Sequence, residues 1–206
     1  MDQFSRYIWE SVSCLANLMS PITRPTTRSK QSVSLSFYSF MFAEMIAQSV
    51  RTSPQTGEHL ETRLHRLGSN IGDRCIALFH LRDRPFRRET SPLALLQFIA
   101  SNVWRSLFNK GAEVMATDQP TEFYLVDKSM ILNRYISVSL EAAQAGSAVN
   151  CANFAAGIIE GMMKTAGFKA TKVDAVYTHT GSLELVDDPT NVTFIVKLDG
   201  HEHRKS

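Results

Sequence analysis

Residues 149–168 read VNCANFAAGIIEGMMKTAGF and predict a helix that is apolar on nearly every side. Asn150 is placed to cap the start of this helix, and Gly167 to close its end in a left-handed conformation. Gly157 and Gly161 lie one turn apart on its least apolar stripe. A helix of this composition must be covered by its own domain or by a partner. We therefore interpret it as a central core helix, with Gly157 and Gly161 as sites of close packing against a neighbouring backbone or subunit.

Three amphipathic helices are expected before this segment. They should span about residues 33–52, 58–81 and 91–108, because apolar residues recur there at three- and four-residue steps. The second of them also carries two glycines one turn apart, Gly68 and Gly72. Each glycine costs a helix about 1 kcal/mol relative to alanine, so the pair indicates that something packs closely against this helix.

The pattern changes after the third helix. Residues 123–126 and 135–138 are short and β-prone, and residues 172–179 and 191–198, after the apolar helix, also favour strands. A turn is expected at 53–57. Three helices, two strands, one helix and two strands predict an α+β fold, in which helices pack on a twisted, mainly antiparallel sheet.

One domain is expected over residues 33–199, with a loose extension at 1–32 and a polar tail at 200–206. The 206 residues are 44% hydrophobic and 20% charged, and the net charge of +2 does not point to nucleic acid. Three widely separated cysteines without zinc-type spacing indicate a reduced, cytosolic chain. No apolar run reaches the roughly 20 residues that span a bilayer.

The sequence has none of the familiar catalytic or phosphate-binding motifs, so neither a cofactor nor a metal is expected. Cys151 falls in the first turn of the apolar helix, where the helix dipole lowers a thiol pKa. A nucleophilic cysteine also needs a base and an oxyanion site, and the sequence shows no signature of either. We interpret Cys151 as packing, with a thiol enzyme as one alternative. A second alternative is a small-molecule or lipid-binding module, because a core rich in Met and Phe can leave a hydrophobic cavity.

A basic loop connects the second and third helices. Its arginines are Arg82, Arg84, Arg87 and Arg88. Such a loop is usually solvated, and the alternative is peripheral contact with a membrane, since each basic residue near anionic lipid contributes about 1 kcal/mol. Nucleic acid is disfavoured because neither a basic helix nor an aromatic stacking platform accompanies the loop.

Several blocks, in order along the chain, resemble the small subunits of TRAPP, the transport protein particle of the secretory pathway, and in particular the complex subunit 5 type. Asn70-Ile71-Gly72-Asp73-Arg74 matches the NIG-x-R pattern of that family, and Arg88-Glu89-Thr90 matches its RET motif. The other blocks are Thr23-Arg24-Pro25 with SVSLSFYSFMFAEMI (32–46), FYLVDKSMILNRYISVS (123–139) and the apolar helix. The resemblance covers about residues 21–198, and the order and spacing of the blocks are specific.

The resemblance implies a non-catalytic structural subunit of an assembly that tethers vesicles and acts as a guanine nucleotide exchange factor for a Rab GTPase. Such a chain would be cytoplasmic, peripheral to endoplasmic reticulum and Golgi membranes, and paired with a subunit 3 type relative. The first two helices would then supply a heterodimer face: Phe37, Phe40, Met41, Glu44, Leu60, Leu64, Leu67 and Ile71.

One position departs from the subunit 3 relatives. Those proteins carry an acylated cysteine shortly before their RET motif, and the matching position here is Arg84. An arginine cannot form a thioester, so no fatty acid is expected at this site.

Overall fold

The structure is a computed structural model. It describes residues 33–82, 89–117, 119, 121–135, 149–168, 170–177 and 190–199, without the side chains of 54–56, 80–82 and 171. Several predictions lie outside the described residues: the extension at 1–32, the side chain of Arg82, the residues Arg84, Arg87 and Arg88, the strand at 136–138 and the tail at 200–206.

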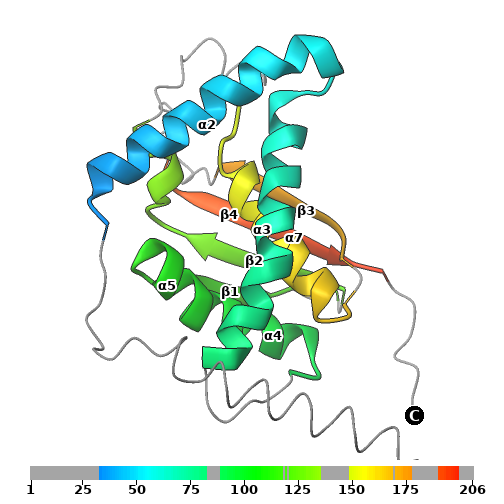
Figure 1. The fold of residues 1–206 in the computed structure, drawn as a ribbon. Coiled ribbons are helices and arrows are strands. Elements are labelled where there is room, and N and C mark those ends of the chain that lie inside the picture. Colours follow the sequence, from blue (N-terminus) through cyan, green and yellow to red (C-terminus); the bar gives the residue numbers. More distant parts are fainter. Residues whose placement is uncertain are drawn as a thin grey trace, which may run out of the picture. The chain divides into compact units, whose positions relative to one another are not determined.

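The predicted α+β fold is confirmed, and its four strands form one antiparallel sheet in the order β1-β2-β4-β3 (Figure 1). The helices are α2 (Leu35–Thr56), α3 (Leu60–Arg82), α4 (Pro92–Phe98), a π-helical segment (Ile99–Val103), α5 (Trp104–Phe108), a 3-10 turn (Ile131–Asn133) and α7 (Asn153–Thr165). The strands are β1 (Glu113–Ala116), β2 (Glu122–Asp127), β3 (Ala170–Tyr177) and β4 (Val192–Leu198).

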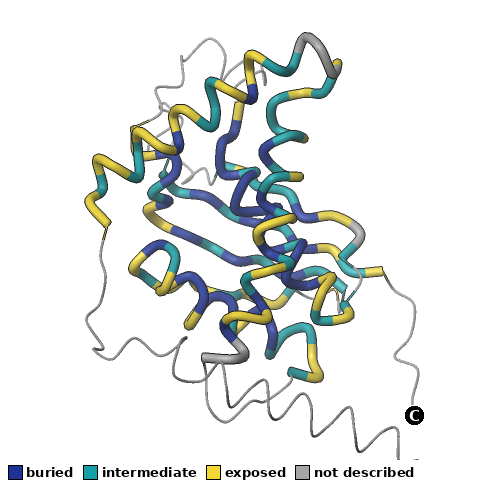
Figure 2. The backbone as a smooth tube through the Cα atoms, viewed as in Figure 1, coloured by how far each residue is buried: buried dark blue, intermediate teal, exposed yellow. Residues whose placement is uncertain are grey.

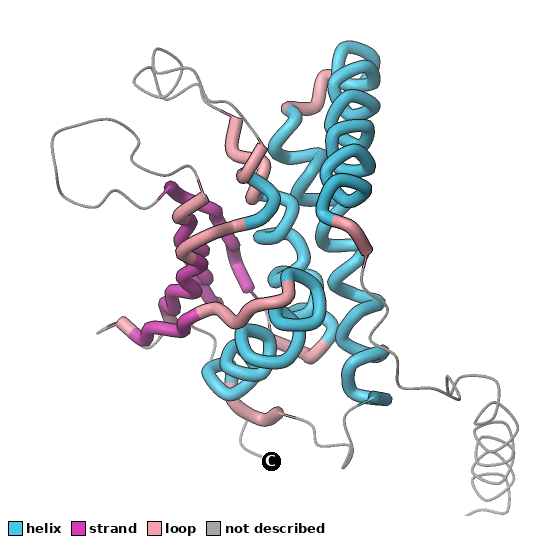
Figure 3. The backbone as a smooth tube through the Cα atoms, turned by 90° about the vertical axis from the view of Figure 1, so that its left-hand side faces the viewer, coloured by secondary structure: helices cyan, strands magenta, loops and turns pink. Residues whose placement is uncertain are grey.

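The sheet turns one face toward the helices, which lie on that side of it (Figure 3). Alternate residues of β2 and β4 are buried there, as the period of two in a strand requires. The register sets Leu125 opposite Phe194, so their side chains lie together under the helices. The buried residues of the two strands are Phe123, Leu125, Asp127, Val192, Phe194 and Val196.

Two elements of the helical region differ from the expectation. The prediction of a turn over the whole of residues 53–57 is wrong, because α2 continues to Thr56. The chain reverses at Gly57, where φ is 65°. The third helix contains a π-helical turn, and the carbonyl of Ala100 in that turn accepts a hydrogen bond from the N–H of Ala112 (3.0 Å). The extra residue in the π-turn thus ties this helix to the start of β1.

The predicted end of the apolar helix α7 is confirmed. Gly167 is left-handed, with φ of 96°. The N–H of Phe168 donates to the carbonyl of Met163 (2.9 Å), and the N–H of Gly167 donates to that of Lys164 (3.0 Å). This is the Schellman arrangement, in which the last carbonyls of the helix find donors just beyond it.

The prediction that Asn150 caps α7 is wrong, because the helix begins at Asn153, directly after Ala152, and no side chain caps it. Oδ1 of Asn150 accepts a hydrogen bond from the N–H of Ala152 (3.0 Å), within the turn that precedes the helix. Asn150 also donates from its backbone N–H to Oε1 of Glu61 (2.7 Å) and from Nδ2 to the carbonyl of Ala175 (3.0 Å). This single buried residue thereby joins α3, β3 and the start of α7.

The glycines of α3 meet the backbone of α7. A Cβ atom placed on Gly68 would overlap the carbonyl oxygen of Phe154, and one placed on Gly72 would overlap that of Ile158. Because the contact advances by one turn on both helices, α3 and α7 run in the same direction. Each glycine Cα–H therefore points at a carbonyl oxygen, which is the geometry of a weak Cα–H···O hydrogen bond.

The glycines of α7 meet the backbone of α3 in the same way. A Cβ atom on Gly157 would overlap the carbonyl oxygen of His65, and one on Gly161 would overlap that of Ser69. We call these four residues, Gly68, Gly72, Gly157 and Gly161, the glycine seam. The glycine seam lies on the stripe of α7 that carries its glycines. The large side chains on the other sides of α7, such as those of Ile159 and Met162, are fully buried in the core.

A buried charge sits at the end of β2. Asp127 accepts hydrogen bonds from Nε1 of Trp104 to Oδ2 (2.8 Å) and from the N–H of Ser129 to Oδ1 (3.0 Å), and it forms an ion pair with Lys110. Its side chain is 1% exposed. The carboxylate thus joins α5, the connection to β1 and the end of β2, and no local sequence pattern had indicated it.

We expect Gly161→Ala to lower the free energy of unfolding by about 2 kcal/mol, because the new methyl group must displace the backbone of α3. Helix propensity alone would instead raise it by about 1 kcal/mol. Urea unfolding of the full chain measures the difference. Gly111→Ala is the matched control, since a Cβ atom there would lie 3.5 Å from the carbonyl oxygen of Ala100, an ordinary contact. A Gly161→Ala protein more stable than the parent would contradict the seam.

Removal of the buried carboxylate is a second test of the fold. Asp127→Ala should cost about 3 kcal/mol, because it leaves the indole N–H of Trp104 buried without its acceptor and the Lys110 ammonium without its partner. Asp174→Ala, which removes an exposed pair with Lys172, should cost less than about 1 kcal/mol. Equal losses in the two variants, measured by urea unfolding, would show that Asp127 does not hold these elements together.

Candidate subunit interface

One side of α2 packs on the core. The rings of Phe42 and Phe154 meet edge to face, with centroids 5.7 Å apart and planes at 61°. Ser49 is also buried, and its hydroxyl donates to the carbonyl of Met45 (2.8 Å). The inward side of α2 therefore buries its apolar side chains against this chain's own core, and its buried hydroxyl has a hydrogen-bond partner within the chain.

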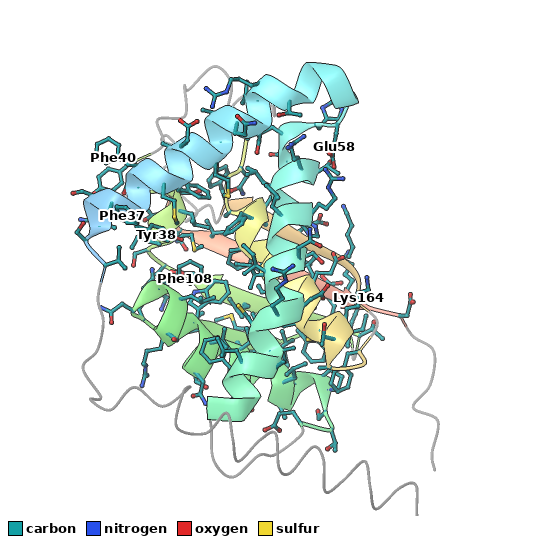
Figure 4. All side chains as sticks on the ribbon, in the orientation of Figure 1. Phe37, Tyr38, Phe40, Glu58, Phe108 and Lys164 are labelled. Carbon is teal, nitrogen blue, oxygen red and sulfur yellow. The ribbon has the colours of Figure 1, made fainter. Side chains whose placement is uncertain are left out.

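The opposite side of α2 is apolar but exposed. Phe40 is 77% exposed and Met41 is 55% exposed, and we call these two residues the α2 patch. Phe40 and Tyr38 project from opposite sides of the helix (Figure 4). Phe37, on the preceding turn, is 60% exposed. Exposed residues follow the outer side of α2 along its length (Figure 2). A helix that is apolar on both sides has more apolar surface than its own domain uses.

The outer side of α2 becomes polar toward its C-terminal end. Glu44 forms an exposed ion pair with Arg51, and Arg51 also donates to Oε1 of Gln48 (3.2 Å from its Nη2). Of the predicted interface residues on this helix, Phe37, Phe40, Met41 and Glu44 all face outward. The exposed aromatic residues of α2 are thus in its first half, and Val50 is an exposed large apolar residue of the second half.

A second apolar stripe follows α3. Ile71 and Leu78 are exposed, while Leu60 and Leu67 are half-buried. We call these four residues the α3 stripe. The prediction that Leu64 contributes to an interface is wrong, because its side chain is completely buried in the core of this chain. Leu64 lies one turn before Gly68, on the side of α3 that turns inward.

The NIG-x-R segment of α3 is divided between two environments. Gly72 belongs to the glycine seam, and Oδ1 of Asp73 accepts a hydrogen bond from the hydroxyl of Thr165 at the end of α7 (3.0 Å). Asn70, Ile71 and Arg74 are exposed. The same short segment therefore holds α7 and presents side chains to solvent.

Cys151 is not an activated nucleophile. It precedes α7, whose first residue is Asn153, and it is 4% exposed. Burial, together with the carboxylate of Glu61, raises the pKa of its thiol to about 11. The interpretation of Cys151 as a packing residue is confirmed by its place in the core, and desolvation sets the direction of the pKa shift. The thiol stays protonated at neutral pH.

In the part of the chain that the structure describes, no group of three or more His, Cys, Asp and Glu side chains is arranged to hold a metal ion. Among the described helices, none combines the length and apolarity that crossing a membrane demands.

The chain is similar to known trafficking proteins. The model of the family "Transport protein particle (TRAPP) component" matches residues 38–199. Trafficking protein particle complex subunit 5 of Dictyostelium discoideum is 36% identical over 151 residues, which are 72% of this chain and 78% of that protein. The Homo sapiens protein of the same name is 34% identical over 167 residues, 80% of this chain and 85% of the relative.

A solved structure shares the fold. It is a trafficking protein particle complex subunit 3 from Naegleria fowleri, covalently bound to palmitic acid, with a TM-score of 0.61 and 17% sequence identity. The match covers 84% of this chain and 98% of that one. At this identity the likeness concerns the fold alone.

The buried thiol predicts a pH dependence of stability. The unfolded chain loses the Cys151 proton near pH 9, whereas the folded chain keeps it until about pH 11. This contribution to stability is therefore complete below pH 9 and is lost as the pH rises to about 11. Urea unfolding at pH 8 and pH 10.5 should show a smaller alkaline loss in Cys151→Ala than in the parent chain. An identical alkaline loss in both proteins would mean that the thiol is not desolvated.

Proposed function

Because the chain belongs to the family of TRAPP components, we propose that it serves as the complex subunit 5 type member of a TRAPP assembly. Its role there is structural and non-catalytic. The single observation that carries the proposal is the α2 patch, in which a phenylalanine that is 77% exposed lies beside a methionine that is 55% exposed. Burying such side chains is worth about 1.5–3 kcal/mol each, which is a driving force for association that the isolated chain leaves unused.

The partner proposed for this surface is a subunit 3 type relative. In the proposed dimer the α2 patch contacts the helices of this partner, together with Phe37 on one side of the patch and Glu44 on the other. The α3 stripe supplies further apolar contacts through Leu60, Leu67 and Ile71. Aromatic side chains at the centre of an interface with a polar surround are the usual energetic anchors of protein–protein contacts. The ion pair of Glu44 with Arg51 forms part of such a polar surround.

The assembled complex, in this proposal, acts as a guanine nucleotide exchange factor for a Rab GTPase and tethers vesicles in traffic between the endoplasmic reticulum and the Golgi. The chain works at the cytoplasmic side of those membranes, without an active site of its own. The protonated, buried Cys151 supports the non-catalytic role. A covalent fatty acid at Arg84 is not part of the proposal, since an arginine side chain cannot form a thioester.

Phe40→Glu tests the interface directly. We expect the variant to fold like the parent, because the side chain contacts mainly solvent, and to bind a subunit 3 type chain about 100-fold more weakly, as loss of a central aromatic anchor does. The measurement is a titration of the two purified chains by isothermal calorimetry, with circular dichroism as the check on folding.

Val50→Glu is the matched control. Val50 lies on the same helix and is 50% exposed, but it is not on the α2 patch. Its substitution should leave the affinity within a factor of about three. If both variants bind as tightly as the parent chain, the proposed interface is wrong.

A further inference from the structure

Two arginines of α3 lie among the residues of the α3 stripe. Arg63 is four residues before Leu67, and Arg74 is four residues before Leu78. Residues four apart on a helix are neighbours on one face, so each arginine lies one turn before a leucine of the stripe. We call Arg63 and Arg74 the stripe arginines. They are about 16 Å apart along the helix axis, and they make the outer side of α3 both apolar and basic.

Neither of the stripe arginines forms an ion pair with any residue that the structure describes. Two other arginines of α2 and α3 do, since Arg51 pairs with Glu44 and Arg66 pairs with Glu58. The acids of this surface are therefore already engaged. The stripe arginines leave it with positive charge that its own carboxylates do not balance.

The side chain of Arg63 gives a second, independent indication. Its Nε is buried and has no hydrogen-bond partner, although the residue as a whole is half-buried. A buried donor without an acceptor destabilises a protein, and native structures hold few of them. The free chain thus keeps a guanidinium partly out of water with no group of its own to compensate it. This is the state expected of a binding residue whose acceptor belongs to another molecule.

We propose that the stripe arginines bind acidic side chains of the subunit 3 type partner and so select that partner over a second copy of this chain. The inference rests on the proposed function, because it concerns the same surface. Apolar side chains of the partner cover Leu67 and Ile71, and an Asp or Glu of the partner reaches each guanidinium. Arginine suits this role, since its planar N–H groups match the two oxygens of a carboxylate.

A second copy of this chain would not satisfy the stripe arginines. It would bring the same two unpaired charges, and its Glu44 and Glu58 already have arginine partners. Like charges brought together in an interface oppose association, and this repulsion contributes to specificity as much as attraction does. The charges of α3 therefore favour a different chain with carboxylates at the matching positions.

The surroundings of the stripe arginines also favour a protein over an anionic membrane. Arg74 is exposed and a lipid headgroup could reach it, but Arg63 is half-buried. Headgroups attract basic residues that lie near the membrane surface. A side chain from a docked helix can instead enter between the residues of the stripe and reach both arginines.

The test is a titration of this chain against a purified subunit 3 type relative by isothermal calorimetry. Arg74→Glu should bind about 30-fold more weakly than the parent, and Arg63→Gln about tenfold more weakly. Arg105→Glu is the matched control, because Arg105 is exposed on α5 and also has no ion pair with a described residue. It should leave the affinity within a factor of about three. Circular dichroism checks the folding of each variant, and Arg74→Glu decides the test if Arg63→Gln does not fold.

A charge exchange identifies the acceptors. Each Asp and Glu of the relative is changed to Arg in turn. One of these changes should weaken binding to the parent chain and restore the affinity of the Arg74→Glu chain about tenfold. Sedimentation of this chain alone should show a monomer at concentrations at which the mixture forms the heterodimer.

The outcomes separate this inference from the proposed function. If the parent chain does not bind the relative, both fail. If Phe40→Glu weakens binding but Arg74→Glu does not, only the inference fails. It is also overturned by an equal loss in Arg105→Glu, by the absence of any restoring acid, or by a dimer of this chain as tight as the heterodimer. Binding to phosphatidylserine vesicles that Arg74→Glu abolishes, with an unchanged affinity for the relative, would assign the arginines to a membrane instead.

Discussion

The close approach of two helical backbones at the glycine seam is the constraint on which the rest of this structure depends. Each of the four glycines faces a carbonyl oxygen of the other helix where any side chain would collide. The approach buries most of α7, and its larger residues fill the space above the sheet. It also fixes the rotation of α3 about its own axis, because the glycines must turn inward. The side of α3 that carries Ile71 and Leu78 consequently remains outside.

That rotation connects packing with assembly. Since α3 packs one side against α7, Ile71 and Leu78 on its other side remain exposed. α2 has the same division, with Phe42 against the core and Phe40 in solvent. The buried polar residues Asp127 and Asn150 join elements of the fold. A chain with exposed apolar side chains on the outer sides of α2 and α3 is suited to the proposed role of holding neighbours in place.

Local pattern predicted what depends on local structure. The helices could be predicted from the period of their apolar residues, and Gly167 could be identified as the end of α7. The apolar character of α7 was also evident from its sequence. The sequence could not show that Leu64 is buried while other apolar residues of α3 face outward. Which residues are buried depends on how α3 is rotated about its own axis in the folded chain. β1 is only four residues long and lacks a periodic signal. The pairing of Trp104 with Asp127 joins residues 23 positions apart, which no local pattern links.

Hydrogen exchange of the chain, alone and in complex with a subunit 3 type partner, tests the central claim most directly. The account predicts that amides of α3 and α7 along the glycine seam exchange slowly and equally in both states. Amides of α2 around Phe40 and Met41 should exchange faster in the free chain and slow markedly in the complex. Equal protection of α2 in the two states, or a change confined to α7, would contradict the assignment of the seam to the fold and of α2 to the partner.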